Sequence, residues 1–352
     1  MMTPKERVTA QIRHQETDFV PYTLSFDEGT GLEERLDAYF GSPRWRDRLD
    51  NAIRPLPAPS AGILIESTLV EKPYPTYWTD VYGTTWRLDK RPHELVEPAL
   101  KQPSLAGYEF PSLEACFDPD WEQRARQTIE RYRDYFIIAP FGFGLFERTW
   151  TLRGFENALT DAVLHPAFYE ELVERITEHQ LAIIERLLEL PVDGIFFSDD
   201  VSYQEGVLIG PERWRRTFKP RLARMYARVH EAGKVVISHH CGCMRPILPD
   251  MIEIGLDVYE SVQPEPPGNS PYELKRLYGE QLTFWGGLGS QSTLPFGTPA
   301  EIKAEVQRLC REMGRGGGFI LAPAKSIQPG TPVENAAAAV EAFLEQAGVS
   351  LP

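Results

Sequence analysis

The chain has 352 residues, of which 42% are hydrophobic and 25% charged, and a formal net charge of −14. This composition is typical of a soluble globular protein, and the acidity excludes polyanions such as DNA, RNA and anionic membrane surfaces as favoured partners. No stretch approaches the ~20 apolar residues of a membrane span. The first residues are charged where a secretory signal would be apolar, and the four cysteines form no disulfide framework. We therefore expect a cytoplasmic protein with free thiols.

Seven short apolar runs along the chain predict buried β-strands. Their hydrophobicity is continuous rather than alternating, which is typical of strands buried on both faces of a parallel sheet. Stretches with helical spacing separate them, such as residues 166–190. The runs cover residues 19–25, 135–141, 192–198, 234–239, 256–261, 282–287 and 317–323.

This alternation of strands and helices predicts an α/β fold. The preferred architecture is a single (β/α)8 TIM-type barrel domain over residues 1–352, with an open doubly wound sheet as the main alternative. Residues 50–130, which are rich in proline and aromatic side chains, are interpreted as irregular insertions around the early strands. Three Thr-Pro-x-Glu segments, starting at Thr3, Thr298 and Thr331, each predict a helix with threonine as its N-cap.

Polar side chains follow several predicted strands, where the active site of a parallel barrel lies. The adjacent carboxylates of Asp199 and Asp200 follow the third strand and are candidates for cation binding, for holding a substrate amine or for acid–base catalysis. The alternative is that one aspartate caps the next loop and the other is solvated. Tyr203 and Gln204, in the same loop, are candidate substrate contacts.

The fourth predicted strand ends in VVISHHCGC, which holds two histidines and two cysteines. Because residues two apart in an extended chain point to the same side, we expect His239 and Cys241 to project together and His240 to point the opposite way. An imidazole and a thiolate on one side supply half of a tetrahedral zinc site. A catalytic Cys241 with His239 as its base, or an ordinary strand end, are the alternatives. The pattern does not define the direction of Cys243.

Other strand ends add further candidates. Glu260 and Gln263 lie at the end of the fifth strand, and Lys325 follows the last one, where it could pair with an anionic group or lie at the rim. Phe143 and Glu147 belong to an aromatic, glycine-rich stretch after the second strand. Such a stretch suits a flat apolar ligand as well as aromatic packing over the barrel.

These segments resemble the uroporphyrinogen decarboxylase-like superfamily over nearly the whole chain. The opening MTPKERVTAQIRHQETDFVP carries the resemblance together with VDGIFFSDD, HHCG, EIGLDVYESVQP and GGFILAPAKSIQPGTPVEN, and residues 192–335 are the most specific part. The family fold is a (β/α)8 barrel, which the resemblance therefore implies for this chain.

The superfamily contains decarboxylases and cobamide-dependent methyltransferases, and the sequence favours the second branch. True uroporphyrinogen decarboxylases carry an Arg-Gln-Ala-Gly-Arg-Tyr segment that grips substrate carboxylates, whereas residues 21–32 contain no arginine. In the methyltransferases, an H-x-C pair and a later cysteine hold zinc. The pair falls on His239 and Cys241, but the later cysteine falls on or near Lys325. The third ligand is thus expected elsewhere, from Gln263, Cys243 or Glu260.

The resemblance implies a zinc-assisted methyltransferase that moves a methyl group between a small substrate and a corrinoid protein or a thiol. The corrinoid-binding signature D-x-H-x-x-G is absent, so the corrinoid is expected on a separate partner protein. A decarboxylase-like lyase for a carboxylated or tetrapyrrole substrate and a non-catalytic ligand-binding barrel are the alternatives, and similar barrels suggest a homodimer. The predicted catalytic residues are Asp199, Asp200 and Lys325, and the predicted substrate contacts are Phe143, Glu147, Tyr203, Gln204 and Gln263.

Overall fold

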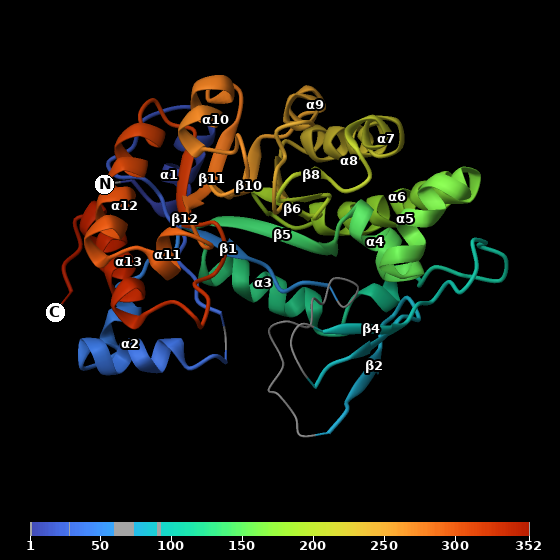
Figure 1. The fold of residues 1–352 in the computed structure, drawn as a ribbon, viewed down its shortest axis with the longest axis horizontal. Helices are drawn as coiled ribbons and strands as arrows, with labels where there is room; N and C mark the ends of the chain where they lie inside the picture. The colour runs from blue at the N-terminus through green and yellow to red at the C-terminus, as the bar shows by residue number, and fades with distance from the viewer. Residues whose placement is uncertain (1, 28, 60–73, 90–92, 352) are drawn as a thin grey trace.

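The computed structural model describes residues 2–27, 29–59, 74–89 and 93–351. Among these residues the main feature is a seven-stranded sheet with the order β1-β5-β6-β9-β10-β11-β12, in which all neighbouring strands are parallel (Figure 1). The strands are β1 (Ile53–Pro55), β5 (Phe136–Phe143), β6 (Gly194–Ser198), β9 (Val235–His239), β10 (Val258–Val262), β11 (Thr283–Leu288) and β12 (Phe319–Pro323). The six strands from β5 to β12 coincide with predicted apolar runs.

Residues 20–27 close this sheet into a barrel by lying between β12 and β1. On one side, the backbone N–H of Thr23 donates to the carbonyl of Leu321 at 3.0 Å, and Tyr22 forms a parallel bridge to Leu321. On the other side, the N–H of Ala52 donates to the carbonyl of Tyr22 at 2.9 Å. The predicted (β/α)8 barrel is thus confirmed, with this segment in the position of the eighth strand.

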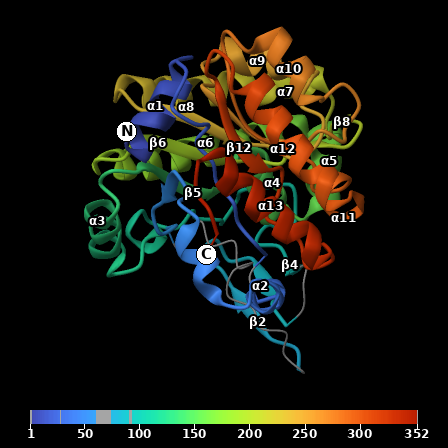
Figure 2. The ribbon, with the colours of Figure 1, turned by 90° about the vertical axis from the view of Figure 1, so that its left-hand side faces the viewer.

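Helices surround the barrel, and long ones such as α6, α8 and α12 bury an apolar stripe. Figure 2 shows α12 and α13 packed side by side over β12. In the described part of the chain, no helix combines the length and apolarity needed to cross a lipid bilayer. The helices of the barrel are α1 (Pro4–Ile12), α4 (Leu145–Arg153), α5 (Phe155–Leu164), α6 (Pro166–Leu188), α7 (Pro211–Thr217), α8 (Lys219–Glu231), α9 (Leu248–Glu253), α10 (Pro271–Tyr278), α11 (Thr293–Phe296), α12 (Pro299–Met313) and α13 (Val333–Gln346).

Two of the three predicted helix caps are present. Thr3 and Thr298 each make both hydrogen bonds of a capping box, at the starts of α1 and α12. The prediction for Thr331 is wrong, because α13 begins at Val333 without a side-chain cap. Thr331 is buried, and its backbone N–H is used in a turn with the carbonyl of Gln328.

The region expected to be irregular contains regular elements of its own. A three-stranded antiparallel sheet of β2 (Tyr77–Thr79), β3 (Thr85–Arg87) and β4 (Glu94–Glu97) lies at one end of the molecule in both views (Figures 1 and 2). Residues 60–73 and 90–92 of this region lie outside the described residues. The described residues before β5 also form α2 (Leu32–Phe40), α3 (Trp121–Arg131) and the short 3-10 helices η1 (Pro43–Arg48) and η4 (Glu114–Cys116).

Candidate functional site

The candidate site lies at the carboxyl ends of β6, β9 and β10, which are neighbours in the barrel. The strand register pairs Ser198 of β6 with His239 of β9, and His239 with Glu260 of β10. Because parallel strands end at the same edge of the barrel, the polar residues that follow them converge there.

Asp200, His239 and Cys241 form a group of three half-buried side chains, called here the Asp-His-Cys cluster. One ligand atom from each residue lies within 4.8 Å of the others. His239 Nε2 is 3.4 Å from Cys241 Sγ and 3.5 Å from Asp200 Oδ1. Asp200 Oδ1 also accepts a 2.7 Å hydrogen bond from the backbone N–H of Cys241. This bond fixes the loop after β9 against the loop after β6.

Glu260 binds the other nitrogen of the same imidazole. Its carboxylate is hydrogen-bonded to His239 Nδ1, so Nε2 faces Asp200 and Cys241. Burial lowers the pKa of His239, but the Glu260 carboxylate, hydrogen bonds to Cys241 and Glu260, and Asp200 together raise it well above its ordinary value of 6.5. In metal sites, such a carboxylate–histidine pair orients the ring and increases its basicity as a ligand.

Asp199 and His240 point into the protein instead. The Asp199 carboxylate accepts hydrogen bonds from the backbone N–H groups of Phe146 at 3.1 Å and Glu147 at 2.9 Å, in the first turn of α4. The His240 ring is hydrogen-bonded to the Ser238 hydroxyl at 2.8 Å and to the carbonyl of Asp199. Burial raises the pKa of Asp199 to about 7 and lowers that of His240 to about 4. These hydrogen bonds join the loop after β6 to the start of α4 and to the end of β9.

Glu147 is a buried carboxyl group near the cluster. Its side chain is only 9% exposed, and Oε2 has no hydrogen-bond partner among the described residues. Burial and the neighbouring carboxylates of Asp200 and Asp199 raise the pKa of Glu147 well above its ordinary value. This concentration of acidic groups favours a bound proton or cation.

Gln263 and Cys243 brace the loop after β9. Gln263 Oε1 accepts a 2.7 Å hydrogen bond from the N–H of Gly242, and Cys243 Sγ donates to the carbonyl of Pro267 at 3.6 Å. Gly242 has φ +82°, and a Cβ at this position would lie 2.5 Å from the carbonyl oxygen of Tyr203. Only glycine therefore fits here without displacing the loop.

The remaining predicted substrate contacts are dispersed. Phe143 stacks on Trp86 with 6.0 Å between ring centroids and also packs against Trp150. Tyr203 and Gln204 lie with exposed side chains in the short hairpin of β7 (Ser202–Tyr203) and β8 (Gly206–Val207). Asp200 thus joins His239 and Cys241 in the cluster, whereas Tyr203 contacts the loop after β9 through its backbone carbonyl, which accepts a hydrogen bond from the N–H of Cys243 at 2.8 Å.

A pocket of about 310 Å³ opens beside His239. Phe196 and Trp285 supply aromatic rings to its lining, Ser25 and Ser198 supply hydroxyl groups, and the exposed Lys325 supplies an ammonium group. Sequence reasoning missed Phe196, Ser198 and Trp285. The alternation of side chains along an extended strand, which paired His239 with Cys241, also applies to β6. It predicts that Phe196 and Ser198 point into the barrel, because the residues that alternate with them face the helices.

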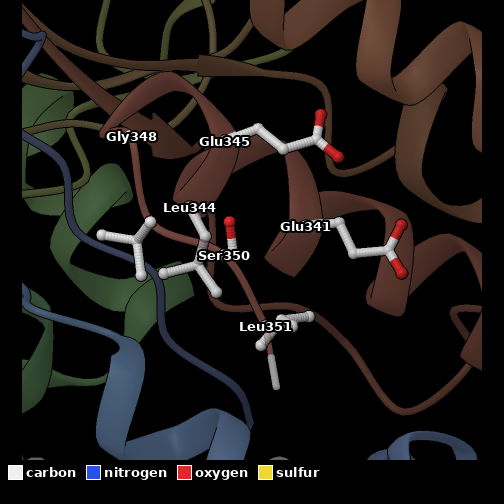
Figure 3. Close-up of a pocket in the computed structure, with 7 residues that line it drawn as sticks. Glu341, Leu344, Glu345, Gly348, Ser350 and Leu351 are labelled. Atoms are coloured by element: carbon white, nitrogen blue, oxygen red, sulfur yellow. The ribbon is translucent and has the colours of Figure 1, made fainter.

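A second hollow of about 520 Å³ lies between α13 and the residues that follow it (Figure 3). Its carboxylates, from Glu341 and Glu345, extend to the same side of the helix and pair with Lys303 at 2.7 and 2.9 Å. Both carboxylates therefore share one lysine, and no candidate site residue lines this hollow.

The fold and the mouth of the barrel define a class of protein, a (β/α)8 barrel with a polar cluster and a small pocket at the carboxyl ends of its strands. Residues 136–346 match the family described as Uroporphyrinogen decarboxylase (URO-D), and the chain belongs to this family.

Relatives in this family carry two activities in their names. The methylcobamide:CoM methyltransferase MtaA of Methanosarcina barkeri is 30% identical over 174 residues, which are 49% of this chain and 48% of that protein. A uroporphyrinogen decarboxylase of Thermus thermophilus is 30% identical over 182 residues, 51% of this chain and 50% of that protein. The matching part thus spans about half the length of these relatives. The solved structure of a methyltransferase from Methanosarcina mazei has the same fold, with a TM-score of 0.69, 22% identity and coverage of 98% of this chain and 99% of that chain.

Proposed function

We propose that the protein is a zinc-assisted methyltransferase that moves a methyl group between a small substrate and a corrinoid protein or a thiol. The observation that carries this proposal is the approach of His239 Nε2 to Cys241 Sγ, 3.4 Å apart at the barrel mouth. The similarity to a methylcobamide:CoM methyltransferase supports it. A separate partner protein would supply the corrinoid, because the chain lacks the D-x-H-x-x-G signature.

The residues at the mouth fit a zinc ion. Histidine nitrogen and cysteine sulfur are its common protein ligands, and His239 and Cys241 supply one of each. The buried Glu147 Oε2 has no hydrogen-bond partner among the described residues, and such an unpaired oxygen suits a region that holds a cation. When bound, zinc would lower the pKa of a substrate thiol or polarise the heteroatom that releases the methyl group.

The pocket would position the substrate beside this pair. Its volume of about 310 Å³ lies at the lower end of the roughly 300–1,000 Å³ typical of small-molecule sites, which supports a small substrate rather than a tetrapyrrole. The Lys325 ammonium would attract an anionic end of the substrate, while the rings of Phe196 and Trp285 exclude water. Glu260 would keep His239 Nε2 directed toward the cluster.

A decarboxylase-like lyase is the second candidate, and the position of Lys325 in the pocket favours it. Lys325 would then receive the substrate carboxylate, and Asp200 would orient the substrate without a metal ion. The similarity to a uroporphyrinogen decarboxylase supports this alternative.

Zinc content and methyl transfer test the proposal together. We expect the full chain, purified without chelators, to hold about one zinc ion and to demethylate methylcobalamin in the presence of small thiols, as followed by corrinoid absorbance. Cys241→Ala should lose both properties. Cys310→Ala, which removes a half-buried thiol of α12, should retain both. A zinc content far below one ion per chain that Cys241→Ala does not change would contradict the proposal. If such metal-free protein decarboxylated a carboxylated substrate, the lyase would be favoured.

A further inference from the structure

We infer that Asp200 is the third protein ligand of the zinc ion, so that the site combines one nitrogen, one sulfur and one carboxylate oxygen. This inference rests on the proposed function, because it concerns the same ion. None of the three residues that the sequence suggested as third ligand, Gln263, Cys243 and Glu260, belongs to the Asp-His-Cys cluster.

The two separations from His239 Nε2 to the other members of the cluster match those of tetrahedral zinc ligands. Zinc binds nitrogen and carboxylate oxygen at about 2.0–2.2 Å and sulfur at about 2.3 Å. At a tetrahedral angle, these bond lengths place a nitrogen ligand about 3.6 Å from a sulfur and about 3.4 Å from an oxygen. The structure has 3.4 Å from His239 Nε2 to Cys241 Sγ and 3.5 Å from His239 Nε2 to Asp200 Oδ1. Three such ligands are also the number that catalytic zinc sites use.

The charges of the cluster match as well. The Asp200 carboxylate and a Cys241 thiolate together balance the two positive charges of zinc. The structure pairs Asp200 with His239, and it places no lysine or arginine within ion-pair distance of Asp200 among the described residues. A divalent cation would relieve the repulsion that these groups otherwise exert on one another.

The other three candidates are engaged elsewhere. Glu260 binds His239 Nδ1, on the opposite side of the imidazole from Nε2. The Gln263 side-chain oxygen accepts a hydrogen bond from Gly242, and the Cys243 thiol donates to a backbone carbonyl. Each would have to break its contact to reach the cluster, whereas the Asp200 carboxylate already lies there.

Metal titration of the apoprotein tests this assignment without an activity assay. Asp200→Asn removes the carboxylate charge but keeps an oxygen that can accept the hydrogen bond from the Cys241 N–H. We expect it to weaken zinc affinity more than 100-fold, because losing an outer-shell partner alone costs about 10- to 100-fold. Glu205→Gln, which removes an exposed carboxylate of the β7–β8 hairpin, should stay within about threefold of the unmodified protein.

Cobalt substitution gives a second measurement. In Asp200→Asn the charge-transfer band of the Cys241 thiolate should persist at saturating Co²⁺, while the visible d–d bands change in position and intensity. Asp200→Ala serves as the second variant, and circular dichroism of each apoprotein checks its fold. Unmodified protein that binds neither zinc nor cobalt would overturn this inference and the proposed function together. Unmodified protein that binds zinc with an affinity unchanged by both Asp200 variants would overturn the inference about Asp200 alone.

Discussion

The hydrogen bond between Glu260 and His239 Nδ1 fixes the direction of a single imidazole ring. Carboxylate partners of metal-binding histidines typically contribute about 10- to 100-fold to metal affinity. We therefore expect Glu260→Gln to lower zinc affinity by about this factor in a competitive titration while circular dichroism stays unchanged. Glu253→Gln, which alters an exposed carboxylate of α9, is the matched control. Equal affinity of Glu260→Gln and unmodified protein would mean that the ring keeps its orientation without the carboxylate.

Adjacent residues of the site point in opposite directions. The sequence predicted these directions for His239 and His240 but not for Asp199 and Asp200. The period of two along an extended strand correctly directed His239 toward Cys241 and His240 into the protein. The same argument applies to Asp199 and Asp200, since Ser198 is paired with His239 and residues two apart share a side. The sequence alone gave no register between β6 and β9, so both aspartates were candidates. The register depends on how the strands pair in the folded protein, and it places Asp200 rather than Asp199 on the side of His239.

At the scale of elements, His179 of helix α6 contacts the inserted region of residues 50–130. Its Nε2 lies 3.1 Å from the hydroxyl of Tyr82 and 3.6 Å from Cys116 Sγ, and its ring packs against Phe110. Burial, with a smaller contribution from the Arg148 charge, lowers the pKa of His179 to about 4. The contact therefore requires the neutral imidazole.

This contact predicts a pH dependence of stability. The unfolded chain binds a proton at His179 below its ordinary pKa of 6.5, whereas the folded chain does so only below about 4. The stability that the neutral ring contributes is present above pH 6.5 and is lost as the pH falls toward 4. Compared with His179→Gln, the unmodified protein should lose roughly 1–3 kcal/mol more of its unfolding free energy between pH 7 and pH 4.5 in urea titrations. If the unfolding free energies of the two proteins had the same pH dependence, His179 would not be its cause.

The elements that the sequence did not predict are those without a local signal. The β1 strand has three residues, too few to form an apolar run, and only its pairing with β5 makes it a strand. Residues 19–25 were predicted as a strand, yet the segment 20–27 forms only isolated bridges, because Pro21 lacks an N–H to donate. Long, continuously apolar strands such as β5 needed no tertiary information.

At the scale of the whole molecule, the candidate metal centre is small compared with the core that supports it. The cluster residues lie at the end of β9 and on the loops after β6 and β9, which are neighbouring strands, whereas buried apolar side chains from strands and helices throughout the described chain form the main core. A metal ion at this position would cross-link elements that the sheet already joins. The barrel should therefore fold without it.

Metal removal should leave a folded protein that is slightly less stable. Binding to the folded state alone contributes RT ln(1 + [L]/Kd), which is about 2.7 kcal/mol when free zinc is 100-fold above its Kd. We expect chelation to leave the far-UV circular dichroism unchanged and to lower the thermal midpoint by a few degrees, since 1 kcal/mol shifts a large domain by about 2–4 °C or less. Restored zinc should reverse the shift in unmodified protein and in Cys310→Ser, but not in Cys241→Ser. Unfolding on chelation would instead mean that the metal is a structural part of the barrel, and an equal shift in Cys241→Ser would place the ion outside the cluster.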